Sequence, residues 1–99
     1  MSSKITYTFS GKLWRHSPNG GWYFVSLPKD ISKEIRTQNQ WMEEGWGRLK
    51  ATAEILNLQW NTSIWFDTKI ETYLLPIKAD IRRKTKIKID EVLDVKIFI

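Results

Sequence analysis

The stretch YLLPIKADIRRKTKIK, residues 73–88, runs from a short apolar segment through Pro76 into a basic segment. Proline cannot donate a hydrogen bond to a strand ladder, and its fixed φ suits the first turn of a helix. A strand is therefore predicted to pass through Pro76 into a short helix. Residues 78–88 contain six basic residues and one acidic residue, an excess of five that equals the net charge of +5 of the whole chain. This helix is the first place to look for a site that binds a negatively charged partner.

The length and composition of the chain limit its class. Its 99 residues form one domain on the usual scale, so a single β-barrel domain over residues 1–99 is predicted. The sequence has no cysteine, which excludes a disulfide framework, a thiolate metal site and a cysteine nucleophile. Residues 1–4 lead directly into a strand pattern without an apolar leader, and no apolar run is long enough to span a bilayer. A cytoplasmic protein with no membrane contact is expected.

Apolar and polar residues alternate in several segments, which is the period-two pattern of strands with one face on a core. The predicted strands are residues 5–13, 22–27, 48–55, 59–67, 70–75 and 91–99. Dense turn chemistry at residues 17–21 predicts a hairpin between the first two strands. A first helix is expected from Pro28 to about Thr37, followed by a long, mobile loop over residues 38–47. Six strands and two short α-helices predict a mainly β fold, a small barrel.

An internal repeat supports a barrel made of two related halves. Residues 23–31, YFVSLPKDI, resemble residues 73–81, YLLPIKADI, because each has an aromatic-led strand, a Leu-Pro pair and an Asp-Ile pair in a helix. The two copies differ by insertions when their Leu-Pro pairs are matched, so the repeat is weak as sequence. Both copies nevertheless occupy the same point in an order of strand, strand, helix, strand, and this predicts two pseudo-repeated halves.

Four short motifs occur in a characteristic order along the chain. They are FVSLP at residues 24–28, WNTSI at 60–64, YLLPIK at 73–78 with IRR at 81–83, and DEVLDV at 90–95. In this order they resemble the bacterial domain-of-unknown-function family nineteen-oh-five, over nearly the whole chain. The resemblance implies a double-split β-barrel of the class shared with AbrB-like transcription factors, and it implies no established activity.

The basic stretch carries the main candidate binding site. Lys78 and Arg82 lie one turn apart on the predicted helix, with Arg83 beside them, and guanidinium groups can hold a phosphate or a carboxylate. A small-anion site would require Trp60 and Ser63 to converge with Lys78 and Arg82. The alternative is a solvated helix face whose basic residues lie near the helix C-terminus, where the helix dipole favours positive charge.

Six tryptophans in 99 residues form a second notable feature. Trp22 and Trp60 share the phase of inward strand positions, so core packing is predicted for both. Trp14, Trp65 and Phe98 fall on the outward phase, and together they would form an exposed aromatic patch. Soluble monomers rarely keep such a patch without a partner. Contact within the core or within an oligomer is favoured over stacking on nucleic-acid bases.

The remaining residues provide little support for catalysis. His16 is the only histidine, so no metal site and no cofactor are expected. Neither a nucleophile with an adjacent base nor a paired-carboxylate motif is evident. We therefore expect a non-enzymatic binding or accessory domain that presents its basic helix to an acidic partner, with nucleic acid as the first alternative. A small-anion pocket or an enzyme is the second. A monomer is expected, with a dimer as the alternative.

Overall fold

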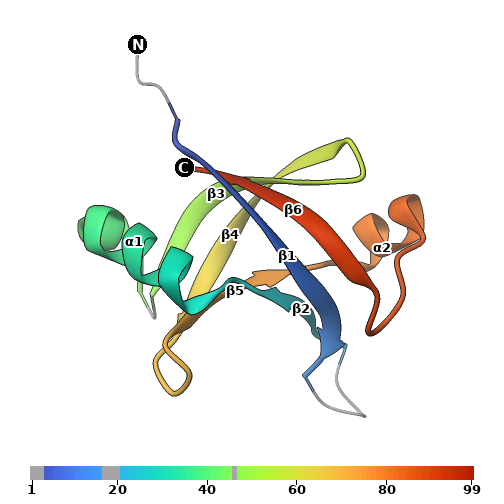
Figure 1. The fold of residues 1–99 in the computed structure, drawn as a ribbon, viewed down its shortest axis with the longest axis horizontal. Coiled ribbons are helices and arrows are strands. Elements are labelled where there is room, and N and C mark those ends of the chain that lie inside the picture. Colours follow the sequence, from blue (N-terminus) through green and yellow to red (C-terminus); the bar gives the residue numbers. More distant parts are fainter. Residues whose placement is uncertain (1–3, 17–20, 46) are drawn as a thin grey trace.

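The computed structural model describes residues 4–16, 21–45 and 47–99. Within these residues the strands close into one antiparallel barrel (Figure 1). They are β1 (Thr6–Arg15), β2 (Tyr23–Ser26), β3 (Arg48–Ile55), β4 (Leu58–Asp67), β5 (Thr72–Pro76) and β6 (Val92–Phe98). Two α-helices, α1 (Lys29–Asn39) and α2 (Ala79–Thr85), and the 3-10 helix η1 (Gln40–Met42) complete the elements. The prediction of a mainly β, six-stranded barrel with two short helices is confirmed.

The order of strands around the barrel is β1-β2-β5-β4-β3-β6. Exchanging the first three strands of the chain with the last three leaves this closed order unchanged, which is the pattern expected of two related halves. The halves meet where β2 pairs with β5, and equivalent hydrogen bonds occur on each side of that pair. Leu27 N–H donates to the Tyr73 carbonyl at 2.9 Å, and Ile77 N–H donates to the Tyr23 carbonyl at 2.8 Å.

The two copies of the repeat are related by a constant shift of 50 residues. Tyr23 corresponds to Tyr73, and Leu27 corresponds to Ile77, in both the hydrogen bonds and the β2–β5 register. The insertions inferred from matching the Leu-Pro pairs are therefore wrong. Pro28 corresponds to Lys78, and the two prolines occupy different places in their halves, because Pro76 is still the last residue of β5.

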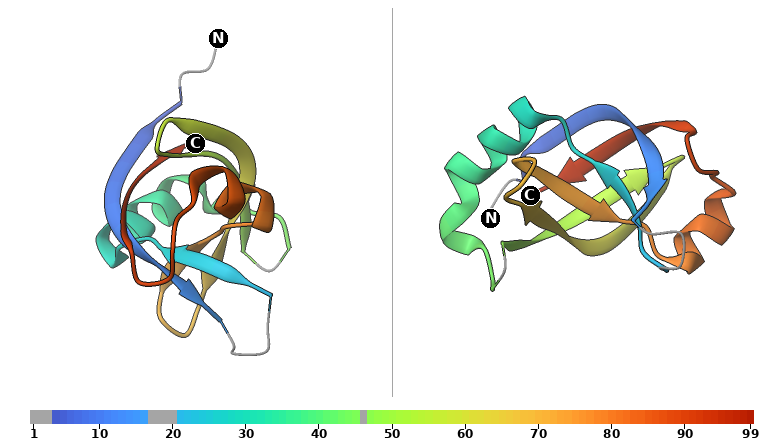
Figure 2. Two further views of the ribbon diagram at one scale, coloured as in Figure 1. Left: turned by 90° about the vertical axis from the view of Figure 1, so that its right-hand side faces the viewer. Right: turned by 90° about the horizontal axis from the view of Figure 1, so that it is seen from below.

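The two helices lie at opposite sides of the barrel, with α1 and α2 at the left and right edges of Figure 1; Figure 2 shows the same arrangement from two other sides. Each contributes one isoleucine to the core, Ile35 from α1 and Ile81 from α2. Helix α1 is longer than predicted, because the Asn39 side chain donates a hydrogen bond to the Ile35 carbonyl at 3.0 Å and stabilises the last turn. The long loop expected at residues 38–47 is largely structured, since η1 follows α1 directly and Glu44 forms a bridge with Arg48.

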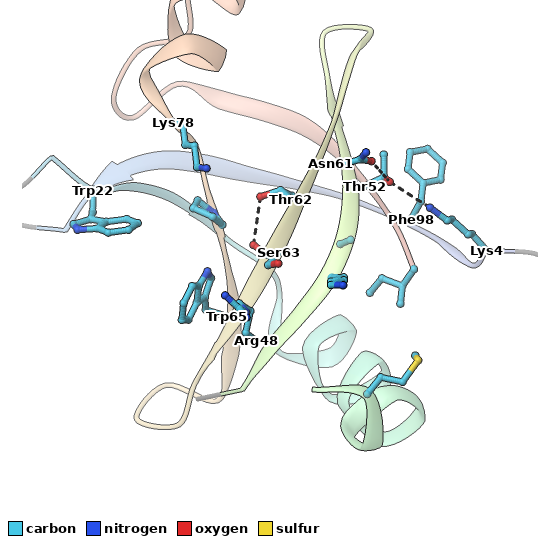
Figure 3. A pocket seen from close by; sticks show the side chains of 15 residues that line it. Lys4, Trp22, Arg48, Thr52, Asn61, Thr62, Ser63, Trp65, Lys78 and Phe98 are labelled. Atoms are coloured by element: carbon cyan, nitrogen blue, oxygen red, sulfur yellow. Dashed lines mark hydrogen bonds between the residues drawn. The ribbon is translucent and has the colours of Figure 1, made fainter. Parts of the chain in front are cut away.

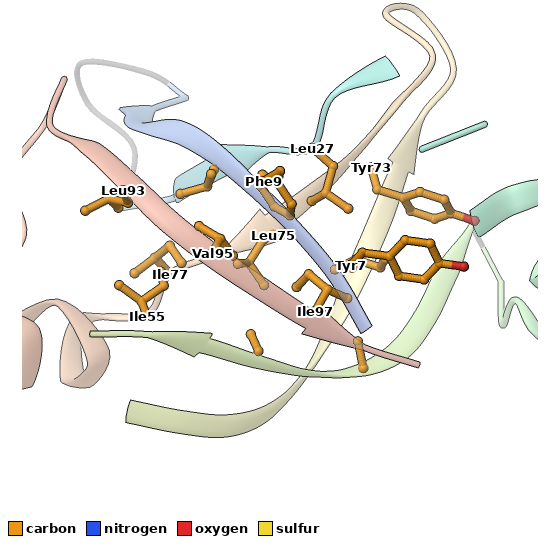
Figure 4. Packing of buried hydrophobic residues seen from close by; sticks show 14 of the residues in the cluster. Tyr7, Phe9, Leu27, Ile55, Tyr73, Leu75, Ile77, Leu93, Val95 and Ile97 are labelled. Atoms are coloured by element: carbon orange, nitrogen blue, oxygen red, sulfur yellow. The ribbon is translucent and has the colours of Figure 1, made fainter. Parts of the chain in front are cut away.

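The core occupies the inside of the barrel and is built from alternate residues of each long strand (Figure 4). Four β1 and β6 side chains, Phe9, Leu13, Val95 and Ile97, are at most 7% exposed. This confirms the alternation from which the strands were predicted. Strand β5 differs, because all five of its residues are buried on both faces. Of its outward residues, Leu74 and Pro76 each line a surface pocket.

Strand β1 changes partners along its length. Its first part, from Thr6 to Lys12, pairs with β6, and its last three residues pair with β2. Gly11 lies just before this change, and a Cβ atom on it would lie 2.7 Å from Val25 Cγ1. The absence of a side chain at Gly11 lets β2 approach closely enough to close the barrel. The turn predicted at residues 17–21 lies outside the described residues except for Gly21.

The two tryptophans predicted to be inward differ in their environments. Trp60 is partly buried and packs against the core, as predicted. Trp22 is 58% exposed, so its assignment to the core is wrong. It precedes the first residue of β2, and its ring stacks on Phe24 outside the barrel with a centroid distance of 6.1 Å. None of the helices in the described residues has the length and apolar character needed to cross a membrane.

Candidate functional site

The basic helix divides its charged residues between different roles. The Arg82 guanidinium lies 3.7 Å from the Tyr23 ring centroid, and its Nη1 donates to the Ile77 carbonyl at 2.8 Å. Both contacts join α2 to the barrel, so this cation stabilises the junction between helix and strand. Arg83 and Lys78 are exposed. Of the three predicted basic site residues, Lys78 lines a large hollow on the outside of the barrel.

That hollow has a volume of about 790 Å³ and lies over the outer faces of β3 and β4 (Figure 3). We call it the basic hollow, because its lining includes the four cationic residues Lys4, Arg48, Lys50 and Lys78. Three aromatic side chains line it as well, namely Trp22, Trp65 and Phe98. In Figure 3, Trp22 and Lys78 stand on one side of the two strands, and Lys4 and Phe98 on the other.

The pairing register of β3 and β4 determines which residues lie side by side on the floor of the basic hollow. Arg48 is opposite Trp65, Lys50 is opposite Ser63, and Thr52 is opposite Asn61. All six side chains line the hollow, because alternate residues of a strand point to the same face. Cationic and polar residues of β3 therefore lie beside aromatic and polar residues of β4.

The electrostatic balance in the basic hollow is positive. No aspartate or glutamate belongs to its lining among the described residues, and the acidic side chain that contacts two of its cations is Glu44. Glu44 lies 3.4 Å from the Arg48 guanidinium and 3.9 Å from Lys50 Nζ. The Lys50 side chain is 84% exposed, so this ion pair contributes little and leaves the ammonium group accessible to a ligand.

The structure brings together only part of the predicted small-anion site. Ser63 and Lys78 line the same hollow, while Trp60 packs against the core and Arg82 contacts Tyr23. Sequence reasoning missed Arg48 and Lys50, although both fall on the outward phase of their strand. Alternation shows which residues point outward, but it does not show which strands are neighbours. The missing information was the register of β3 against β4.

The three outward aromatic residues are divided between two pockets, and Trp65 lines both of them. Trp14 and Trp65 line a second, smaller pocket, which also contains Phe24 and Trp22. Phe98 lines the basic hollow without Trp14. The nearest aromatic neighbour of Trp14 is Phe24 on β2, with a centroid distance of 5.3 Å. We call this smaller pocket the aromatic pocket.

A polar cluster closes the barrel beside α1. The Tyr73 hydroxyl donates a short hydrogen bond to Glu43 Oε2, and Glu43 also lies 3.8 Å from the Arg36 guanidinium. Burial and the Glu43 carboxylate raise the pKa of Tyr73 well above its usual value. The Arg36 guanidinium covers the Phe66 ring at 3.7 Å. These contacts tie α1 and η1 to the barrel, and they leave the tyrosine protonated at neutral pH.

The described residues contain no group of three or more histidine, aspartate and glutamate side chains arranged to hold a metal ion. His16 is exposed and lies at the aromatic pocket, edge-on to Phe24. A comparison with curated proteins found no match. The model of the family described as "Domain of unknown function (DUF1905)" matches residues 9–97, nearly the whole chain. The chain therefore belongs to this family of domains of unknown function.

Proposed function

We propose that this protein is a non-enzymatic binding domain and that it binds single-stranded nucleic acid in the basic hollow. The observation that carries the proposal is the β3–β4 register, which sets Arg48 and Lys50 beside Trp65 and Ser63 on one surface. Proteins that bind single strands combine a positive groove that follows the backbone with aromatic side chains on which bases stack.

The extent of the basic hollow favours a polymer over a small anion. Its four cationic residues come from the segment before β1, from β3 and from the start of α2. One phosphate or carboxylate would contact only part of this set, whereas several phosphates in a row can neutralise all of it. The exposed indole of Trp22 favours nucleic acid over an acidic protein, because a flat ring offers a stacking surface for a base.

The position of α2 disfavours a duplex. The helix has 7 residues, and Arg82 on it is already bound to the barrel. Duplex readers usually place an exposed helix or a two-stranded ribbon in a groove. The aromatic side chains at the hollow can stack only on bases that are not already paired and stacked, which is the condition of a single strand.

The test is fluorescence anisotropy with labelled single-stranded DNA and RNA of roughly 12 nucleotides, a length within the site sizes of single-strand-binding domains. We expect binding that weakens steeply between about 50 and 200 mM salt. The double variant Lys50→Ala with Lys78→Ala should weaken binding about equally for all sequences and reduce the slope of log affinity against log salt.

The matched control is Arg83→Ala with Lys84→Ala. These two residues are exposed on α2 and are absent from the lining of the basic hollow, and their removal changes the net charge by the same amount. The control should bind like the unmodified protein. Absence of binding at low salt would exclude the proposal, and so would equal weakening by both double variants. Tighter binding to polyglutamate than to nucleic acid would assign the hollow to an acidic protein instead.

A further inference from the structure

The aromatic pocket lies next to the basic hollow and has a volume of about 350 Å³. Trp14 and Phe24 form the side made by β1 and β2, Trp65 forms the β4 side, and Leu74 of β5 lies between them. Leu74 points outward, as shown by its pairing with Ser26 and Trp65, yet it is only 9% exposed. A volume of this size is within the range of pockets that take small organic groups.

The walls of the aromatic pocket are held in place by contacts within the protein. Trp14 Nε1 donates to Ser26 Oγ at 2.9 Å, which satisfies the indole and fixes its ring. The Phe24 ring is nearly parallel to the Trp22 ring, with an angle of 6° between them. An aromatic surface that is ordered before the ligand arrives loses little conformational entropy on binding.

The basic hollow and the aromatic pocket share two of their lining residues, Trp22 and Trp65. A strand that crosses the hollow would therefore pass the mouth of the pocket. We propose, on the basis of the function proposed above, that the aromatic pocket accepts one unstacked base of the bound single strand. The base stacks on the aromatic walls while its flanking phosphates contact the cations of the hollow.

Asp67 indicates which bases the aromatic pocket favours. It is the one carboxylate among the described lining residues of the pocket, and an ionised carboxylate only accepts hydrogen bonds. Its Oδ1 accepts the Lys69 N–H at 2.9 Å, and no hydrogen bond within the described part of the chain uses Oδ2. Cytosine, adenine and guanine present an amino group to such an acceptor. Uracil and thymine have no amino group, and carbonyl oxygens flank their ring N–H on both sides, so the carboxylate repels them.

The experiment compares oligocytidine and oligouridine of roughly eight nucleotides, within the site sizes of single-strand binders. We expect oligocytidine to bind about fivefold or more tightly, which is the lower end of the discrimination that one good base contact provides. Asp67→Asn should remove or reverse this preference, because the amide can donate to a uracil carbonyl. Trp14→Leu alters the aromatic pocket without altering the lining of the basic hollow. It should weaken the binding of oligocytidine while leaving the slope of log affinity against log salt unchanged.

The outcomes separate the two proposals. If neither oligonucleotide binds at low salt, nucleic acid is excluded as a ligand altogether. Equal binding of both oligonucleotides, unchanged by Asp67→Asn and by Trp14→Leu, would overturn the base pocket and leave the basic hollow as the whole site. Asp67 lies at the end of β4 and is partly exposed, so its substitution tests the proposal even if Trp14→Leu fails to fold.

A second occupant has to be distinguished, because aromatic rings with a carboxylate also attract organic cations. Tetramethylammonium chloride is the probe, with sodium chloride at equal ionic strength as its control. We expect tetramethylammonium to change the tryptophan fluorescence of the free protein no more than the sodium salt does. A larger change that Trp14→Leu abolishes, without any displacement of oligocytidine, would overturn the base assignment in favour of a cation.

Discussion

Tyr7 and Tyr73 point their hydroxyl groups toward the same end of the barrel, and the two groups meet different surroundings (Figure 4). The Tyr73 hydroxyl binds Glu43, while the buried Tyr7 hydroxyl has no hydrogen-bond partner among the described residues. We expect Tyr73→Phe to lower the free energy of unfolding by about 1 to 2 kcal/mol, because Glu43 loses a bonded donor. Tyr7→Phe should leave it unchanged or raise it by about 1 kcal/mol, because an unsatisfied polar group is removed. Urea unfolding monitored by tryptophan fluorescence measures both changes.

The two tyrosine substitutions are matched, since each removes one oxygen from an inward β-strand position. Burial, and to a lesser degree the charge of Glu34, raises the pKa of Tyr7 above 10.0. The pKa of Tyr73 is raised as well, so measurements at pH 7 compare protonated hydroxyls in both cases. A loss of stability in Tyr7→Phe equal to that in Tyr73→Phe would contradict the assignment of the two environments.

Single residues also show where sequence reasoning failed. Trp22 was predicted to share the phase of inward strand positions, but Val25 and Leu27 are the buried residues of this segment. Trp22 therefore falls on the outward phase together with Phe24, and its ring stacks on Phe24 outside the barrel. Residues 22–25 are all apolar or aromatic, so alternation alone does not show which phase of this segment faces the core.

At the level of elements, α2 provides a direct test of which basic residues serve the fold. Arg82→Ala should lower the free energy of unfolding by about 1 to 2 kcal/mol, because it removes both the contact with the Tyr23 ring and the hydrogen bond to Ile77. Arg83→Ala, the exposed neighbour on the same helix, should change it by less than about 0.5 kcal/mol. Thermal or urea unfolding compares the two variants.

The same pair of α2 variants separates stability from binding. Nucleic-acid affinity of folded Arg82→Ala should fall no more than expected for one lost charge outside the basic hollow. A large loss of affinity with unchanged stability would show that Arg82 contacts the ligand, and it would contradict the structural role assigned here.

Most elements could be predicted from the sequence, because strands with one buried face alternate apolar and polar residues, and this period of two is visible in the order of the residues. The end of α1 and the 3-10 helix could not, since both depend on polar contacts. Asn39 binds the Ile35 carbonyl, and the Trp41 indole donates to the Gln38 carbonyl at 3.1 Å. Such local hydrogen bonds leave no apolar pattern in the sequence. Ser63 and Lys78 of the candidate site were identified from residue type, whereas their neighbours Arg48 and Lys50 required the register of β3 and β4.

For the molecule as a whole, the repeat shows which contacts serve the fold in both halves. Ser32 on α1 occupies the place that Arg82 has on α2, and each contacts the tyrosine of the other half. Ser32 Oγ accepts the Tyr73 N–H at 3.0 Å, and the Arg82 guanidinium covers the Tyr23 ring. The two halves thus share a junction and differ in the surface beside it. The AbrB-like class implied by the family resemblance stays a prediction, and the proposed site does not depend on it.

The closed barrel also predicts the oligomeric state. Every strand in the order β1-β2-β5-β4-β3-β6 pairs on both sides within one chain, so no strand of the described residues leaves an edge to pair with a second copy. We therefore expect a monomer at micromolar concentration, measured by sedimentation velocity, and a complex with one protein per short oligonucleotide. The exposed Trp22 and the partly exposed aromatic residues beside it are the alternative interface, because apolar patches can hold two copies together. A stable dimer is the contrary result, if Trp22→Ser dissociates it and nucleic acid does not. It would show that this surface binds protein and that the basic hollow is not open to a single strand.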